Sequence, residues 1–303
     1  MTITHAAEIG FGSSNLYGGS RRALSVALVR AAADSGIKWI DTAPLYGHGA
    51  AEEIVGEAIR GRRDELVLVS KVGILPTQIK LPYRLRSKAT AWASRVPGGN
   101  ALFPPPAPLH PKFNVFAPTD VVVSVERSLR ALGTDRLDYL LLHEVDPQVA
   151  SDPVLLDVLD ALVTGGKVLA YGTATQADKT RAIAAGPQAG RFALFQMPAD
   201  TDPLPTGSIV LHSLLGGVLR QTMARLKTEQ SLRETAKALD IDPDQPDLAR
   251  RLIASALRRE GVRAVLFSTS DVDRVRDMVG AATLSPAAAD AGKRLIAKAM
   301  WDG

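Results

Sequence analysis

Residues 119–143, TDVVVSVERSLRALGTDRLDYLLLH, place an amphipathic helix directly before a buried strand. Apolar residues recur every three or four positions up to Gly133, which predicts a helix capped by Thr119 and ended by that glycine. The following run, LDYLLL (137–142), is almost continuously apolar, as expected of a strand that is covered on both faces. This unit favours a parallel sheet whose strands are joined by helices.

The same alternation of strand and helix continues along the chain. Helical spacing returns between most of the apolar runs, as in the segment that begins near Ser20 and ends at Gly36. Eight strand–helix units in 303 residues predict a single (β/α)8 TIM barrel domain over residues 1–303, with a doubly wound sheet as the alternative. The other seven predicted strands are EIGFG (8–12), IKWID (37–41), LVLVS (66–70), KVLAYG (167–172), FALFQM (192–197), SIVLHS (208–213) and RAVLFS (263–268).

One segment, residues 73–118, interrupts this rhythm. It shows neither helical nor strand periodicity, and it holds nine of the 19 prolines of the chain. Because it follows the third predicted strand, we predict a long active-site loop over the C-terminal face of the barrel, with a plain surface insertion as the alternative. Its aromatic and imidazole side chains would then shape the pocket, namely Tyr83, Trp92, Phe103, His110, Phe113 and Phe116.

Composition narrows the partners and the compartment. The chain has no cysteine, which excludes disulfides, thiolate metal sites and cysteine nucleophiles. Its net charge of +4 comes from basic residues interleaved with acidic ones, so we expect a small-molecule partner rather than nucleic acid. Neither an apolar run of about 18 residues nor a signal-peptide pattern is present, and we therefore expect a cytoplasmic protein without membrane association. The sequence leaves the oligomeric state open.

Four polar residues stand at or just after the ends of predicted strands. Asp41 ends the second strand, Tyr46 follows in its loop, Lys71 ends the third strand and His143 ends the fourth. In a barrel all of these positions lie on the C-terminal face. Each residue alone has an ordinary structural explanation, such as a turn cap for the aspartate or a satisfied core position for the histidine. Together they form a set suited to carbonyl chemistry.

Reduction of a carbonyl by a hydride needs an acid that protonates the forming alkoxide. Free tyrosine, with a pKa of about 10, is a weak acid, so we expect Lys71 to lower the pKa of Tyr46 and Asp41 to hold Lys71 in place. A neutral His143 would donate a hydrogen bond to the substrate oxygen. The four residues therefore predict an oxidoreductase with Tyr46 as the general acid or base.

These residues lie in stretches that resemble the aldo-keto reductase family. The stretches are GIKWIDTAPLYGHGAAEEIVGEAI, VLVSKVG, SVERSLRALGTDRLDYLLLHEVD and LFQM, in the order that the family shows. The segment TAPLYGHG is similar to the subgroup of aldose, fucose and pyridoxal dehydrogenases. The resemblance implies a barrel oxidoreductase that uses NAD(P)(H) to interconvert an aldehyde or ketone, with sugars among the candidates, and its alcohol. It also implies that Asp41, Tyr46, Lys71 and His143 form the catalytic tetrad.

The nucleotide site that the resemblance implies departs from the family pattern. Ala174 and Thr175 stand where a Ser-Asn pair usually holds the nicotinamide carboxamide, and His212 stands where an aromatic ring usually stacks on the nicotinamide. Met278 replaces an asparagine that usually meets adenine. The positions carried over as cofactor contacts are Ser13, Gln196, His212, Ser213, Leu215, Ser268, Thr269 and Arg274.

Arg274 makes NADP(H) the preferred cofactor, with NAD(H) as the second choice. By the resemblance it lies near the adenosine 2′-phosphate, which a guanidinium can bind through two hydrogen bonds. A solvated arginine on a helix flank is the alternative.

Three other functions are alternatives to the oxidoreductase. The altered nicotinamide contacts allow a nucleotide-binding barrel with little turnover that acts as a sensor or regulatory subunit. A Schiff-base aldolase would use Lys71 as its nucleophile, although pairing with Asp41 would suppress that role. A metal hydrolase would use His143, Glu144 and Asp146, but strand alternation points Glu144 away from His143, so no metal is predicted.

Overall fold

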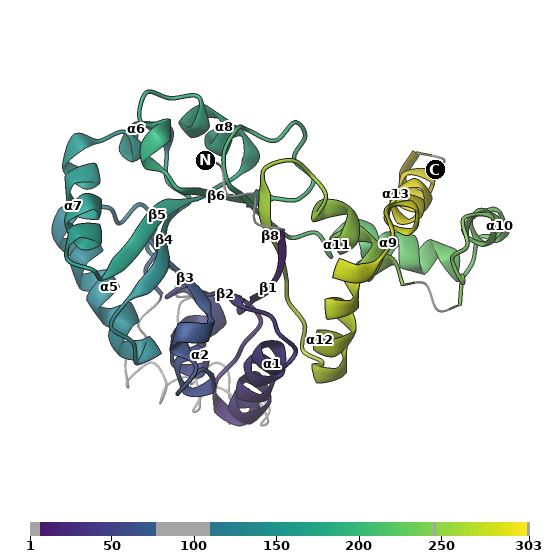
Figure 1. Cartoon of the computed structure of the whole chain (residues 1–303), viewed down its shortest axis with the longest axis horizontal. Helices are drawn as coiled ribbons and strands as arrows, with labels where there is room; N and C mark the ends of the chain where they lie inside the picture. The colour runs from purple at the N-terminus through teal and green to yellow at the C-terminus, as the bar shows by residue number, and fades with distance from the viewer. Residues whose placement is uncertain (1–6, 77–109, 245–246, 302–303) are drawn as a thin grey trace, which may run out of the picture.

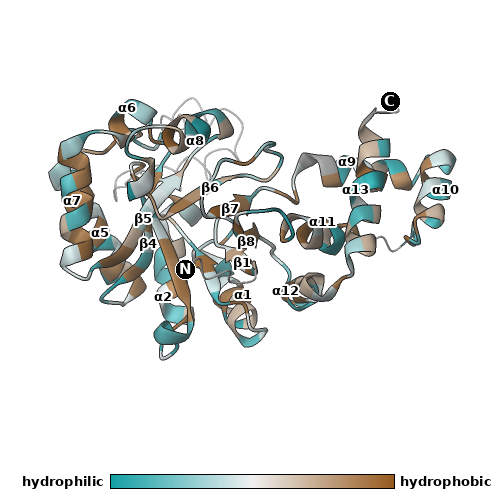
Figure 2. Cartoon of the chain, turned by 45° about the horizontal axis from the view of Figure 1, so that its top comes forward, coloured by the Kyte–Doolittle hydropathy of each residue, from teal (hydrophilic) through white to brown (hydrophobic). Residues whose placement is uncertain are grey.

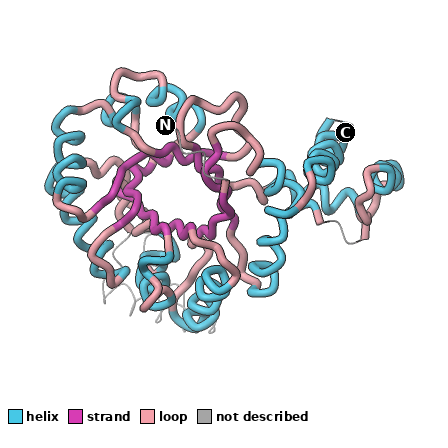
Figure 3. The backbone as a smooth tube through the Cα atoms, in the orientation of Figure 1, coloured by secondary structure: helices cyan, strands magenta, loops and turns pink. Residues whose placement is uncertain are grey.

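The computed structural model describes residues 7–76, 110–244 and 247–301. Eight parallel strands follow one another around a closed barrel, and the last strand pairs with the first. Figure 3 shows this ring of strands with the helices outside it. The predicted (β/α)8 barrel is confirmed. Its strands are β1 (Glu8–Gly12), β2 (Trp39–Asp41), β3 (Val67–Val72), β4 (Leu137–His143), β5 (Val168–Ala174), β6 (Leu194–Pro198), β7 (Ile209–His212) and β8 (Val262–Phe267).

The helices cover the outside of the ring and extend to one side of it (Figure 1). None of the described helices is both long enough and apolar enough to cross a membrane. Their bounds are α1 (Arg22–Asp34), α2 (Ala51–Ala58), α5 (Pro118–Leu132), α6 (Pro147–Ala150), α7 (Pro153–Thr164), α8 (Ala177–Ala184), α9 (Gly217–Leu226), α10 (Gln230–Ala238), α11 (Leu248–Ala256), α12 (Val272–Val279) and α13 (Pro286–Trp301).

The predicted alternation fails at one connection. Residues 199–208, between β6 and β7, contain no helix. A helical crossover between parallel strands needs about a dozen residues or more, and this segment is shorter and carries Pro203 and Pro205.

The predicted end of helix α5 is confirmed, whereas its predicted start is not. Gly133 adopts a left-handed conformation with φ of 64° and closes the helix, as predicted. The predicted cap at Thr119 is wrong, because the helix begins one residue earlier at Pro118 and Ala117 precedes it without a side-chain cap. Proline suits the first helical position because its fixed φ is already helical and its missing N–H would have no partner there.

Apolar residues fill both sides of the barrel wall. Figure 2 shows hydrophobic colour concentrated along the strands and mixed colour on the surrounding helices. The interior of the ring holds its own cluster, in which the Trp39 and Tyr139 rings stack with centroids 5.4 Å apart. A barrel interior packed in this way is a core rather than a channel.

A separate small core, which we call the satellite core, lies away from the barrel among α9, α10, α11 and α13. Figure 1 shows α9, α10 and α13 projecting to one side of the ring. Helix α9, which contributes Leu226 to the satellite core, begins directly after the loop that leaves β7. Its buried members are Leu226, Leu232, Ala236, Ile241, Leu248, Ala291, Leu295 and Ala299.

The two described ends of the 73–118 segment meet at the C-terminal end of β3. Leu75 and Lys112 form an isolated antiparallel bridge, and the Val115 N–H donates to the Gly73 carbonyl at 2.9 Å. Phe116 is buried against Gly73, where any side chain would collide with its ring. The predicted pocket residues Tyr83, Trp92 and Phe103 lie outside the described residues.

Candidate active site

A cavity of about 410 Å³ opens at the C-terminal ends of the strands. Asp41, Tyr46, Lys71 and His143 all line it, from β2, the turn after β2, β3 and β4. Residues far apart in sequence meet here because parallel strands bring their carboxyl ends to the same face of a barrel. The structure thus brings together all four residues of the predicted tetrad. Neither Phe113 nor Phe116 lines this cavity.

Lys71 and Asp41 form a buried ion pair at the base of the cavity. The Lys71 Nζ lies 2.7 Å from Oδ1 and 2.6 Å from Oδ2 of Asp41, and it also donates to the Thr42 carbonyl at 3.0 Å. Only 1% of the Lys71 side chain and 4% of the Asp41 side chain are exposed. Burial lowers the pKa of Lys71 and is the largest single effect, but Asp41 and Tyr46 together outweigh it, so the pKa is raised. The ammonium therefore keeps its charge.

Tyr46 is held over this pair by a tight turn. The turn Tyr46–Gly49 has positive φ at Gly47, where an added Cβ would lie 1.9 Å from the Leu16 carbonyl oxygen, so only glycine fits. The Lys71 Nζ lies 5.0 Å from the centre of the Tyr46 ring. The Tyr46 and His143 rings meet edge to face, with centroids 6.1 Å apart. Phenol, ammonium and imidazole therefore surround one small volume.

The net shift in the acidity of Tyr46 is opposite to the prediction. Burial raises the pKa of Tyr46, and the Lys71 ammonium lowers it by less than burial raises it. The expected direction of the Lys71 effect is present, but the expected net lowering is wrong, because a phenolate loses its hydration in this cavity. The phenol consequently holds its proton at neutral pH.

Two histidines in the cavity are electrically neutral. Burial lowers the pKa of His143 to about 3, and the nearby Lys71 charge adds to this effect. Burial and Lys71 likewise lower the pKa of His212 to about 4. A neutral imidazole retains one N–H donor, which is the form of His143 that the sequence predicts.

Five predicted cofactor residues line the same cavity. Gln196 is buried on β6, where its side chain donates a hydrogen bond to Asp41, and its Oε1 has no partner in the described part of the chain. His212 Nδ1 and Ser213 Oγ lie 2.8 Å apart at the end of β7. The cavity-lining members of the predicted set are Gln196, His212, Ser213, Leu215 and Ser268.

The other three predicted cofactor residues do not line the cavity. Ser13 is fully buried behind its wall, with its N–H bonded to the Asp41 carbonyl at 2.9 Å. Thr269 Oγ1 accepts from the Asp271 N–H at 3.2 Å. Arg274 lies further along on α12 with 75% of its side chain exposed, and its one ion pair is a long contact of 3.8 Å to Asp271.

The positions that depart from the family pattern also differ in placement. Ala174 lines the cavity but offers no polar side-chain atom. The Thr175 hydroxyl is buried against Thr180 Oγ1 at 2.7 Å, so it does not replace a carboxamide contact. Met278 is buried in the main core rather than placed on the surface of α12.

Three polar residues line the cavity without having been predicted as part of the oxidoreductase site, namely Ser14, Asn15 and Glu144. Ser14 and Asn15 lie in the turn directly after β1, and their place after a predicted strand was the available signal. The alternation argument that placed Glu144 away from His143 does not apply, and both residues line the cavity. β4 ends at His143 and Glu144 has φ of 54°, so the alternation of the strand no longer applies to it.

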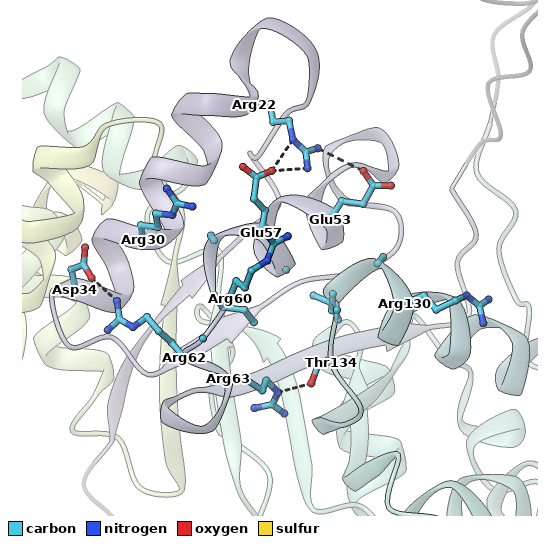
Figure 4. Close-up of a pocket in the computed structure, with 17 residues that line it drawn as sticks. Arg22, Arg30, Asp34, Glu53, Glu57, Arg60, Arg62, Arg63, Arg130 and Thr134 are labelled. Atoms are coloured by element: carbon cyan, nitrogen blue, oxygen red, sulfur yellow. Dashed lines mark hydrogen bonds and ion pairs between the residues drawn. The ribbon is translucent and has the colours of Figure 1, made fainter.

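A larger cavity, of about 870 Å³, lies on the outside among α1, α2 and the end of α5 (Figure 4). Figure 4 shows Arg22 bound to Glu57 and Glu53, Arg62 to Asp34 and Arg63 to Thr134, while no interaction is drawn for Arg30, Arg60 and Arg130. Exposed ion pairs of this kind contribute little energy. Because this cavity contains no strand-end residue, the smaller cavity is the candidate active site.

Comparison with known proteins identifies the family. The sequence model of the Aldo/keto reductase family matches residues 8–197, and the chain belongs to this family. The chain is 33% identical over 193 residues to aldo-keto reductase YhdN of Bacillus subtilis, a match that covers 60% of the chain and 49% of that protein. It is 31% identical over 237 residues to a D-threo-aldose 1-dehydrogenase from Pseudomonas sp, covering 71% of the chain and 68% of that protein.

A solved structure shares the fold. The aldo-keto reductase of Klebsiella pneumoniae in complex with NADPH superposes with a TM-score of 0.65 at 25% identity, over 95% of this chain and 90% of that one. The family that the motifs predicted is therefore confirmed, including its resemblance to an aldose dehydrogenase. The chain spans about half the length of the first of these relatives.

Proposed function

We propose that this protein interconverts an aldehyde or ketone and its alcohol by hydride transfer, with NADP(H) as its cofactor. One observation carries the proposal: the Tyr46 phenol, the Asp41–Lys71 ion pair and the neutral His143 line the same cavity. A carbonyl oxygen placed among them would meet a proton donor, a fixed positive charge and a second hydrogen-bond donor. These groups would stabilise the negative charge that develops on that oxygen as the hydride is transferred.

Each residue of the tetrad then has a separate role. Tyr46 donates its proton to the oxygen in reduction and accepts one in oxidation. Lys71 stabilises the phenolate that remains, and Asp41 fixes Lys71 while balancing its buried charge. His143 orients the substrate oxygen through its N–H. A bound nicotinamide ring would supply or accept the hydride.

The cavity wall suits a nicotinamide nucleotide. The unpaired Oε1 of Gln196 can accept a hydrogen bond from an amide N–H, such as that of the nicotinamide carboxamide. His212 offers a flat ring, while Ser213, Leu215 and Ser268 follow the same rim. Arg274 supports the choice of NADP(H), because in the described part of the chain its exposed guanidinium has one long ion-pair contact, which leaves it able to bind a 2′-phosphate.

The test is a fluorescence titration with NADPH and NADH, followed by assays with a panel of aldehydes and sugars in both directions. Turnover that depends on Tyr46 would support the proposal. Binding of nucleotide without turnover would favour the second candidate, a nucleotide-dependent sensor or regulatory subunit. The specific observation behind that candidate is the end of β5, where Ala174 is apolar and the Thr175 hydroxyl is occupied by Thr180.

A further inference from the structure

Glu144 is a charged residue in the candidate active site that the tetrad does not use. It lines the cavity beside His143, directly after the last residue of β4. Its φ of 54° is unusual for a residue with a side chain and persists where the surrounding structure imposes it. The Glu144 N–H donates to the Ala174 carbonyl at 2.8 Å, which ties this conformation to the end of β5. The Glu144 backbone is therefore fixed between the ends of β4 and β5, where the residue lines the cavity.

The charge of Glu144 is not neutralised by an ion pair within the described ranges. Among the described residues, the Glu144 carboxylate accepts one hydrogen bond, from the neutral Gln176 amide at 3.4 Å. Lys179 on α8 is close enough for Glu144 to contribute to its raised pKa, but its ammonium pairs with Asp146 at 2.7 Å. Lys71 is held by Asp41 at 2.6 Å. The Glu144 carboxylate thus keeps acceptor capacity for a ligand.

The described lining of the cavity carries a net negative charge on the side of Glu144. Asp41 and Lys71 cancel each other, and the imidazoles of His143 and His212 are neutral. The Glu144 charge also reaches the reacting phenol, since it contributes to the raised pKa of Tyr46. A substrate bound at Tyr46 therefore lies within the field of the Glu144 carboxylate, which Lys179 on α8 offsets only through space, without an ion pair between them in the described residues.

We propose that Glu144 determines substrate specificity: it accepts a hydrogen bond from a hydroxyl or ammonium group of the substrate and excludes substrates that carry an anionic group near the carbonyl. A carboxylate is a strong acceptor for either donor, and like charges at close range disfavour binding. The substrate class is therefore carbonyl compounds with a hydrogen-bond donor and without a carboxylate or phosphate. This inference rests on the proposed function.

The experiment compares three small aldehydes in wild type and in Glu144→Gln. Butanal has neither charge nor donor, glyceraldehyde has hydroxyl donors, and succinic semialdehyde is anionic. We expect the variant to raise kcat/KM about tenfold for succinic semialdehyde and to lower it about threefold to tenfold for glyceraldehyde. Butanal has no group for Glu144 to bind or repel, so its change reports only the effect of Glu144 on the Tyr46 phenol, and the changes for the other two aldehydes are expressed relative to it. Intrinsic differences in aldehyde reactivity cancel because each ratio compares one substrate in two proteins.

Three further variants make the result decisive. Glu144→Asp keeps the charge and should retain discrimination against succinic semialdehyde. Glu144→Asn removes the charge in a residue that tolerates positive φ, so it should repeat the Gln result even if Gln perturbs the turn. Glu260→Gln removes the same charge from an exposed residue just before β8, at the opposite end of the barrel, and should change no ratio.

Equal changes for all three aldehydes would overturn the role of Glu144. So would a wild-type protein that uses succinic semialdehyde as well as butanal with ratios unaffected by Glu144→Gln. Failure of the wild type to turn over any aldehyde with either nucleotide is a different outcome, because it contradicts the proposed function itself.

Discussion

Both carboxylate oxygens of Asp41 accept hydrogen bonds from the single ammonium of Lys71, at 2.7 and 2.6 Å, in a place that solvent hardly reaches. The pair fixes Nζ beneath the Tyr46 ring, 5.0 Å from its centre. A buried pair of this kind is a poor source of stability, since both ions lose their hydration. Its geometry instead serves the phenol above it.

Tyr46→Phe should lower kcat at least about a hundredfold, the usual scale of a lost general acid, and leave NADPH affinity unchanged. Phenylalanine keeps the packed ring against His143 and removes only the proton donor. Steady-state kinetics and nucleotide titration measure the two effects. Tyr17→Phe, at a half-exposed ring outside the cavity lining, is the control and should keep the wild-type rate. Near-normal turnover in Tyr46→Phe would remove the phenol from the mechanism.

Lys71→Met should move the pH dependence of alcohol oxidation to higher pH. Burial already raises the pKa of Tyr46, and Lys71 opposes that rise, so its removal raises the pKa further. Oxidation needs the phenolate, and its rate should therefore increase with pH in wild type and increase only at still higher pH in the variant. An unchanged pH profile in an active variant would contradict the role given to Lys71.

The same substitution should cost about 3–5 kcal/mol of unfolding free energy, because it leaves Asp41 buried without its partner. The double variant Asp41→Asn, Lys71→Met should recover part of that loss, since no unpaired charge remains. Denaturant midpoints for wild type and both variants provide the measurement. A double variant less stable than Lys71→Met alone would show that the pair itself stabilises the fold.

Arg274→Ala should weaken NADPH about ten- to a hundredfold, the value of a charge-assisted hydrogen bond of roughly 1.5–3 kcal/mol. NADH lacks the 2′-phosphate, so its affinity should hardly change. Arg276→Ala, on the same helix, is the matched control because Arg276 is similarly exposed but already paired with Asp273 at 2.9 Å. Equal losses for both nucleotides, or none, would argue for NAD(H) instead.

His212→Asn should flatten the loss of stability at acid pH. The pKa of His212 is lowered to about 4 in the folded chain, below its ordinary value of 6.5. As pH falls from 6.5 towards 4, the unfolded chain takes up a proton that the folded chain refuses, so stability decreases. The slope per histidine is at most about 1.4 kcal/mol per pH unit, and it is smaller near either end of this range, where the two states bind more similar numbers of protons. Thermal melting at a series of pH values gives the stability of both proteins. If the two plots of stability against pH remain parallel between pH 6.5 and 4, the shift is contradicted.

The sequence predicted the fold well because buried parallel strands are almost continuously apolar, and all eight runs became strands. It also predicted which strand ends would meet, since Asp41 and His143 are the last residues of β2 and β4 and Lys71 is the residue before the end of β3. The missing helix after β6 could have been recognised from the short proline-containing connection. The start of α5 at Pro118 shows how proline at the first turn can take precedence over a nearby threonine.

Two features of the site depend on the folded environment and were not readable. The direction of Glu144 depends on a positive φ, which the identity of a glutamate does not disclose. The net acidity of Tyr46 depends on how completely the phenol is desolvated, which residue type and spacing cannot measure. The cofactor contacts that were carried over by resemblance were only partly placed at the cavity: Gln196 lines it, whereas Ser13 is buried and does not.

The satellite core has a consequence for the order in which this protein loses its properties on heating. Leu214, Leu215 and Gly216 form one wall of the cavity and lead directly into α9, whose buried Leu226 belongs to that small cluster. Small clusters with few buried side chains open locally before a large core does, and hydrogen exchange detects such opening. We expect amide protons of α9 and α10 to exchange before those of β3 and β4. Mild heat would then release the nucleotide while the ion pair beneath Tyr46 is still intact.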